Sequence, residues 1–155
     1  MKELDLSLLQ RVAVECPGFQ ARATARALTR FYNACFKPLE LTAEQFSLLV
    51  GIGAAQEPTV VDLAESAGVD ATTLSRSVQA LQRRGLVGAE GGRGPAGKRL
   101  SLTPAGVALM AQALPVWERA KTSLSHRLGE ATLQATRQAM MDLADAAAEA
   151  DAALP

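Results

Sequence analysis

The sequence predicts a mainly α-helical fold with one small β-hairpin, and three observations support this. Apolar residues recur at helical spacing through most of the 155 residues. A glycine-rich stretch at 91–97 separates two short segments that are typical of β-strands. Aromatic residues make up 4% of a chain that is 48% hydrophobic, which favours aliphatic, alanine-rich helix packing. The length suits one domain with long helical arms.

The first half of the chain contains helices with recognisable starts and ends. A helix is predicted from Pro17 to about Lys37, because its apolar residues follow helical spacing and Pro38 lies just beyond it. Thr42, with Gln45 three positions later, has the pattern of a capping box that starts a second helix. That helix is expected to end near residue 53.

A short helix, a glycine turn and a further helix come next. Thr59 begins the short helix, and Gly68 occupies the position of a left-handed C-terminal residue. Asp70 can cap the following helix, whose end is marked by Gly85. This order of elements predicts a helix-turn-helix.

The second helix of this pair has two unlike faces. One face is apolar, whereas the other is neutral or basic and contains no carboxylate. The apolar face consists of Leu74, Val78 and Leu81, and the polar face of Thr72, Ser75, Arg76, Gln79 and Arg83. In helix-turn-helix proteins this helix enters the major groove, where Arg76 can pair with guanine and Gln79 with adenine. A solvated amphipathic helix is the alternative interpretation.

Charge is unevenly distributed along a chain whose formal net charge is zero. Segment 71–103 contains six basic residues and one acidic residue, whereas segment 130–155 contains five acidic residues and one basic residue. A basic centre with an acidic arm suits the binding of a polyanion.

A hairpin is predicted directly after the helix-turn-helix. Leu86–Glu90 and Lys98–Thr103 are its expected strands, and Arg93 lies among the glycines of the tip. An arginine at such a tip suits the narrow minor groove of DNA, while a solvated surface hairpin is the alternative. A helix-turn-helix followed by a basic hairpin is a winged helix. The combination is a more specific indication of DNA binding than the helix pair or the hairpin alone.

This order of elements resembles the multiple-antibiotic-resistance-regulator (MarR) family of bacterial winged-helix transcription factors. The matching stretches are LTAEQFSLLVGI, VVDLAESAGVDATTLSRSVQALQRRGLV and LSLTPAG, and the resemblance covers nearly the whole chain. It implies a homodimer with interlocking terminal helices that binds a pseudo-palindromic operator, usually as a repressor. It also implies release of the operator when a small molecule or an oxidant acts.

The resemblance also implies which residues contact DNA. The groove contacts would be Thr72, Thr73, Ser75, Arg76 and Gln79, with Arg93 at the wing tip. The nearby basic residues Arg83, Lys98 and Arg99 complete the candidate set. Wings of the family usually carry an Asp-Arg pair that braces the loop, and Gly94-Pro95 stands at the corresponding place here. The geometry of the wing therefore stays open.

The residues themselves also favour a dimer. Thr103 and Pro104 begin a predicted helix of about 25 residues, with a kink expected at Pro115. Its apolar stripe continues in the last helix, and such arms cannot bury both sides on a small winged domain. We therefore expect dimerisation helices at about 1–37 and 104–155, within a single domain whose DNA-binding region spans about 42–103. A monomeric bundle is the alternative.

Two functions remain open for Cys16. It stands at the start of the first long helix, where the partial positive charge of the helix amides favours a reactive thiolate, and the peroxide-sensing branch of the family has a cysteine near the corresponding place. Cys35 lies 19 residues later, about 28 Å along a straight helix, which is too far for a disulfide within one chain. The alternative is that both cysteines simply fill apolar gaps.

Several function classes are not expected. The sequence has no phosphate loop, no zinc-ligand spacing and no nucleophile motif, so neither an enzyme, nor a cofactor, nor a metal site is predicted. It lacks an apolar run long enough for a membrane span and a signal-peptide core, and the expected location is a reducing cytoplasm. A small aromatic or other apolar ligand in a crevice between the dimer arms and the winged domain is a possible partner. The rival function is a winged helix that binds proteins instead of DNA.

Overall fold

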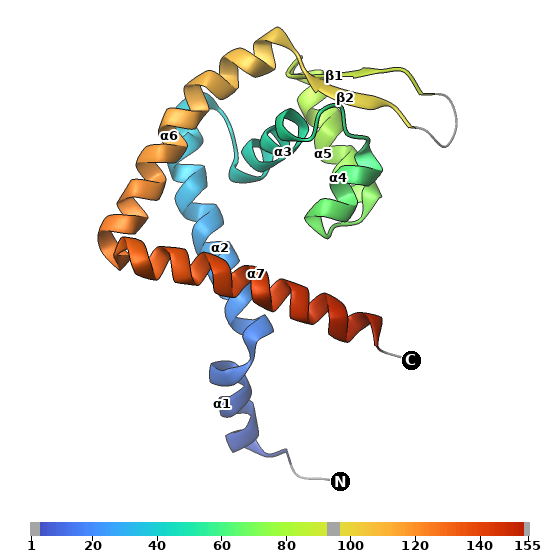
Figure 1. Ribbon diagram of the computed structural model, residues 1–155. Coiled ribbons are helices and arrows are strands. Elements are labelled where there is room, and N and C mark those ends of the chain that lie inside the picture. The colour runs from blue at the N-terminus through green and yellow to red at the C-terminus, as the bar shows by residue number, and fades with distance from the viewer. Residues whose placement is uncertain (1–3, 93–96, 154–155) are drawn as a thin grey trace. The chain divides into compact units, whose positions relative to one another are not determined.

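The computed structural model describes residues 4–92 and 97–153. These residues form helices and a two-stranded antiparallel sheet, which are labelled in Figure 1. The elements are α1 (Leu6–Glu15), α2 (Pro17–Phe36), the 3-10 turn η1 (Lys37–Leu39), α3 (Ala43–Ala54), α4 (Val60–Ala67), α5 (Ala71–Arg83), β1 (Val87–Glu90), β2 (Arg99–Leu102), α6 (Pro104–Leu128) and α7 (Glu130–Ala152). The predicted bounds of α2 to α6 and of the two strands are therefore correct to within one or two residues, whereas neither α1 nor the bounds of α7 were predicted.

The chain divides into two compact units, Met1–Leu114 and Pro115–Pro155, and the boundary falls inside α6 at the proline of that helix. Helix α6 is continuous from Pro104 to Leu128. The kink expected at Pro115 stays a prediction.

The core of the first unit is apolar and draws on several elements. Its fully buried large side chains are Phe36 of α2, Leu49 and Ile52 of α3, Leu81 of α5 and Leu100 of β2. The rings of Phe36 and Phe46 stack with their centroids 4.5 Å apart. Burial of these side chains fixes α3 and α5 against the hairpin, because each loses contact area if its neighbours move.

Local hydrogen bonds account for the helix starts that the sequence predicts. The capping boxes Thr42–Gln45 and Thr59–Asp62 are both complete, with the side chain of each residue bonded to the amide of the other. A side chain of α2 adds to the first of these caps, since Asn33 accepts a hydrogen bond of 2.7 Å from the amide of Ala43. The start of α3 is thereby tied to α2.

The LTPAG motif joins the hairpin to α6 through a close backbone approach. Thr103 caps α6 by accepting from the amide of Gly106 (3.0 Å), and its hydroxyl donates to the carbonyl of Gly85 (2.6 Å). A Cβ atom at Gly106 would lie 2.1 Å from the carbonyl oxygen of Leu86. Glycine is therefore required where α6 passes the end of α5.

Two helices at the ends of the described chain have no core of their own. Neither α1 nor α7 contains a buried residue. Both expose large apolar side chains, namely Leu6, Leu8, Leu9, Val12 and Val14 of α1 and Met140, Met141 and Leu143 of α7.

Candidate nucleic-acid interface

The turn between α4 and α5 is held by short-range hydrogen bonds. Gly68 ends α4 in the left-handed conformation, with a φ of 63°. Asp70 caps α5 by accepting from the amide of Thr73 at 2.9 Å, and it also accepts from the hydroxyl of Thr73. These bonds, that of the hydroxyl first, hold the pKa of Asp70 below its usual value because they stabilise the carboxylate. The first turn of α5 is thus ordered before any partner binds.

Helix α5 separates its faces as the sequence predicts. Val78 and Leu81 are buried, and Leu74 is half-buried against the core. Most of the polar residues on the opposite face are exposed, namely Thr72, Arg76, Gln79 and Arg83. No carboxylate lies within α5 itself, so the exposed face is neutral or basic along its whole length.

Two predicted contact residues are partly engaged within the protein. The hydroxyl of Thr73 is bonded to Asp70, so it belongs to the helix cap. Ser75 is half-buried, and its hydroxyl accepts a long bond of 3.4 Å from Gln79 Nε2. This bond holds the Gln79 side chain along the helix surface.

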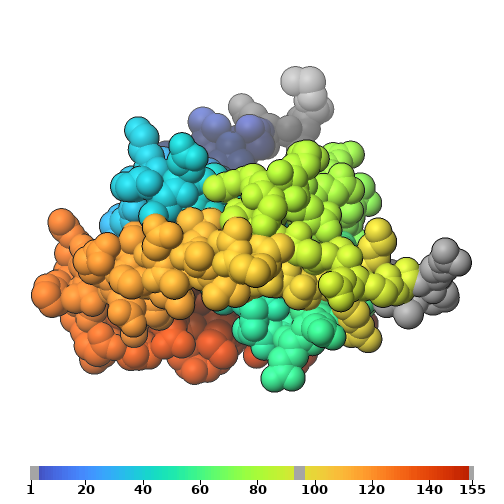
Figure 2. Space-filling view, turned by 90° about the horizontal axis from the view of Figure 1, so that it is seen from above, coloured from blue at the N-terminus to red at the C-terminus, as the bar shows by residue number. Residues whose placement is uncertain are grey.

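The hairpin pairs in the expected antiparallel register. Val87 lies opposite Leu102, and Glu90 lies opposite Arg99. Figure 2 shows the end of α5 and β1 as one continuous yellow-green surface. Lys98 and Arg99 are exposed at the end of the paired strands nearest the tip, while the predicted wing-tip residue Arg93 lies outside the described residues.

The start of β2, which is the end of that strand nearest the tip, is tied to the segment before α4. The amide of Leu100 donates to the carbonyl of Pro58 (2.9 Å), and Arg99 Nη1 donates to the carbonyl of Glu57 (3.2 Å). Gln56 and Glu57 both have positive φ values, of 47° and 61°. Arg99 therefore holds this turn as well as presenting charge, a role that the sequence analysis missed because Glu57 is 42 residues away.

Helix α3 accepts two hydrogen bonds that were also missed in the sequence, one from α5 and one from Arg84, the residue that follows α5. Arg84 Nη1 donates to Gln45 Oε1 at 3.1 Å, and Ser77 Oγ donates to Glu44 Oε1 at 3.1 Å. No local pattern shows these pairs, which are 39 and 33 residues apart in the chain. Arg84 is therefore bonded to the capping box of α3, whereas Arg83 is an exposed member of the polar face of α5.

The cysteines are free thiols. Cys16 is the residue between α1 and α2, and both Cys16 and Cys35 are half-buried. In the part of the chain that the structure describes, no group of three or more His, Cys, Asp or Glu side chains could hold a metal ion. Within the same residues, no helix is long and apolar enough to cross a membrane.

Comparison with known proteins agrees with this geometry. Residues 39–99 match the model of the MarR family. The chain is similar to the M. tuberculosis transcriptional regulator MosR, with 31% identity, a TM-score of 0.77, and 88% of this chain and 98% of that chain covered. MosR in complex with DNA gives 32% identity and a TM-score of 0.78 over the same shares of both chains. The transcriptional repressor CouR, bound to p-coumaroyl-CoA, has the same fold at 24% identity and a TM-score of 0.75, with 92% of this chain and 98% of that chain covered. No curated protein matches the chain.

The matches cover both the winged helix and the helices around it. The family model spans α3, α4, α5 and β1 and reaches the start of β2, while the likeness to MosR extends over most of the chain. The predicted fold class, a mainly α-helical winged helix-turn-helix with a β-hairpin, is confirmed. The chain belongs to the MarR family of transcriptional regulators.

Proposed function

We propose that this chain binds duplex DNA as a homodimer and represses transcription from a pseudo-palindromic operator. The observation that carries the proposal is the exposed face of α5, which is polar and basic, contains no carboxylate and begins at a tightly capped turn. A helix held in this way enters a groove without first having to order its own backbone. The complex of the similar regulator MosR with DNA supports this use of the fold.

The candidate residues have different roles in this proposal. Arg76 and Gln79 read base edges in the major groove, because their exposed side chains can each form two hydrogen bonds with a base. The remaining residues position the protein on the groove walls and phosphates, namely Thr72, Thr73, Ser75, Arg83, Lys98 and Arg99. Arg93 is proposed to enter the minor groove from the wing tip.

A dimer places two such helices on one site. We propose that residues of about 1–37 and 104–155 form the dimer contacts, while residues of about 42–103 bind DNA. The exposed apolar side chains of α1 and α7 support this division, since water is a poor solvent for them. The two recognition helices of a symmetric dimer would meet half-sites one DNA turn apart, about 34 Å.

The test is duplex binding at several salt concentrations. Genomic fragments retained by the purified protein supply the duplex, and fluorescence anisotropy measures its affinity. Affinity should fall steeply with salt, because each phosphate that is neutralised releases counterions. If no duplex binds at low salt, the protein-binding alternative replaces this proposal.

The release mechanism has two candidates. If Cys16 is a sensor, peroxide converts its thiolate to a sulfenic acid, and the added polarity disturbs the start of α2. If Cys16 is structural, release comes from a small apolar ligand. Peroxide titrated against operator binding by the native protein and by Cys16→Ser separates the two. We expect equal insensitivity, because Cys35 is the only other cysteine and lies 19 residues along the chain, near the far end of α2. Loss of binding in the native protein alone would establish the sensor.

A further inference from the structure

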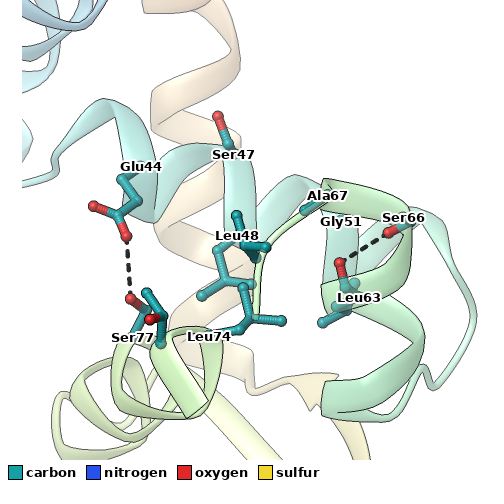
Figure 3. A pocket seen from close by; sticks show the side chains of 11 residues that line it. Glu44, Ser47, Leu48, Gly51, Leu63, Ser66, Ala67, Leu74 and Ser77 are labelled. Carbon is teal, nitrogen blue, oxygen red and sulfur yellow. Dashed lines mark hydrogen bonds between the residues drawn. The ribbon is translucent and has the colours of Figure 1, made fainter. Parts of the chain in front are cut away.

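A cavity of about 290 Å³ lies within the helix-turn-helix itself. Figure 3 shows that its walls come from α3, α4 and α5. Apolar groups make up its interior, with Leu48 on α3, Leu63 and Ala67 on α4, and Leu74 on α5. All of these residues lie in the first unit of the chain. This position differs from the predicted crevice between the dimer arms and the winged domain.

One of the residues that line the cavity, Glu44, carries an exposed carboxylate. Glu44 is the only charged residue among the eleven that line it. Three lining hydroxyls already donate to protein groups: Ser66 to the carbonyl of Leu63 (3.0 Å), Ser77 to Glu44 Oε1 (3.1 Å), and Thr73 to Asp70. Among the described residues, no hydrogen bond occupies the second carboxylate oxygen of Glu44. Among the described lining residues, the side-chain groups left for a ligand are therefore the hydroxyl of Ser47, which makes no hydrogen bond, and the carboxylate of Glu44, which is the charged one.

We propose that this cavity binds a small apolar molecule that carries a protonated amine. The apolar body would lie among Leu48, Leu63 and Leu74, and the ammonium would bond to Glu44. An apolar cavity of roughly 150 Å³ holds benzene, so the larger volume here suits a bicyclic aromatic group. A carboxylate ligand of the same size is disfavoured, because no lining residue is a cation and Glu44 would repel it.

Occupancy of this site is linked to DNA binding, a consequence that rests on the proposed function. Thr73 and Leu74 of the recognition helix form one wall, and Ser77 of the same helix shares the carboxylate of Glu44. Thr73 is also one of the proposed groove contacts, so a ligand held against it lies beside the surface that the duplex would meet. We expect the amine to weaken duplex binding, and duplex to weaken amine binding by the same factor.

The site is tested on the full chain without DNA, so failure of DNA binding cannot hide the result. Three probes of equal size, 1-naphthylmethylamine, 1-naphthalenemethanol and 1-naphthoate, are titrated by calorimetry. We expect the amine to bind at least about tenfold more tightly than the carboxylate. Glu44→Gln should weaken the amine up to about fivefold, as expected for an exposed ion pair, and leave the alcohol unchanged. Glu65→Gln, which removes an equal charge from α4 outside the cavity, is the matched control.

A second pair of variants tests the chamber. Ala67→Leu fills the cavity from the last residue of α4 and should abolish binding of all three probes. Ala54→Leu makes the same change at the last residue of α3, outside the lining, and should bind as the native protein does. Thermal unfolding verifies that both variants fold. Equal affinity for amine and carboxylate, or unchanged amine binding by Ala67→Leu, would overturn the site. Equal amine affinity with and without bound duplex would overturn the link to DNA.

Discussion

The winged-helix segment and the helices α1 and α7 use similar residues in opposite ways. In the winged helix, apolar side chains such as Leu49, Leu81 and Leu100 are almost fully buried within one chain. In α1 and α7, leucines and methionines of comparable size remain exposed, and no residue is buried. The first region completes its core alone, and the second does not.

This difference indicates where the chain needs a partner. Each exposed leucine forgoes the roughly 1.5–3 kcal/mol that full burial of such a side chain gives. A single exposed leucine is ordinary, but α1 exposes Leu6, Leu8, Leu9, Val12 and Val14 within one helix of ten residues. We propose that a second copy of the chain supplies the missing surface, as the family resemblance implies. Substitutions in the winged helix should therefore lower the stability of the fold, whereas substitutions on the exposed apolar faces of α1 and α7 should weaken the dimer.

The largest effect is expected from a charge on α7. Leu143→Glu puts a carboxylate on its apolar stripe, and a symmetric dimer would bury it twice. We expect the dimer dissociation constant to rise at least about a thousandfold, equivalent to roughly 4 kcal/mol. Light scattering across a dilution series measures it. Gln138→Glu is the control, because Gln138 lies about 140–180° around the helix from the stripe residues Leu133, Met140, Leu143 and Ala147. Equal dissociation of both variants would contradict the assignment of this stripe.

A smaller effect is expected from two glycines in the first turns of helices that begin with proline, Gly18 of α2 and Gly106 of α6. Gly106→Ala should lower the free energy of unfolding by about 1–3 kcal/mol or more, because its Cβ would lie 2.1 Å from the carbonyl oxygen of Leu86. Gly18→Ala should be neutral or stabilise by up to about 1 kcal/mol, since its Cβ meets only Arg22 at 3.5 Å and Cys16 at 3.9 Å. Urea unfolding at one protein concentration compares them. If both substitutions lowered the free energy of unfolding by a similar amount, the close approach of Gly106 to Leu86 would not explain the loss.

The sequence predicts most of the fold because the relevant signals are local. The capping boxes at Thr42 and Thr59 and the left-handed Gly68 depend on residues within a few positions of one another, and all three are present. The close approach at Gly106 was not predicted, because Leu86 is 20 residues away in the chain. Local sequence patterns predict where helices begin and end. They do not predict which backbone segments, distant in the sequence, come into close contact.

For the candidate interface, too, the sequence predicts the local features but not the hydrogen-bond partners of the side chains. The exposed face of α5 follows from its periodicity, and Arg76 and Gln79 lie on it as expected. The engagement of Thr73 with Asp70, and of Arg99 with the carbonyl of Glu57, depends on three-dimensional proximity or on rotamers that a sequence does not specify. The roles of these side chains at DNA remain predictions.

DNA affinity should respond to arginines of the winged helix and not to those of α2. Arg76→Ala should cost about 1–3 kcal/mol and relax the preference at one position in each half-site. Arg93→Ala should weaken binding to many sequences alike. Arg30→Ala removes an exposed charge from α2 and should leave affinity nearly unchanged. Anisotropy titrations with the selected operator and single-base variants measure all three; unchanged affinity and preference for Arg76→Ala would show that α5 does not read bases.

The smallest expected effect concerns two aspartates that cap helices in the same way. Asp70 begins α5, and Asp5 begins α1. Hydrogen bonds, chiefly from the hydroxyl of Thr73 and the hydroxyl of Ser7, lower the pKa of each carboxyl below its usual value of 3.8. A lowered folded-state pKa means that the cap stabilises fully above pH 3.8 and is lost as the pH falls through the folded-state value.

The same protonation should have different consequences in the two regions. Helix α5 buries Val78 and Leu81 in the core, so loss of the Asp70 cap should lower global stability. Asp70→Ala should therefore lose its deficit relative to the native protein as the pH falls below 3.8 and through the lowered folded-state pKa. Helix α1 buries nothing within the chain, so loss of the Asp5 cap should increase hydrogen exchange in its first turn and leave global unfolding nearly unchanged. Hydrogen exchange and urea unfolding of Asp70→Ala and Asp5→Ala between pH 7 and pH 3 separate these outcomes. If Asp5→Ala lowered global stability as much as Asp70→Ala, α1 would unfold together with the winged helix. The proposed difference between these two regions would then be wrong for α1.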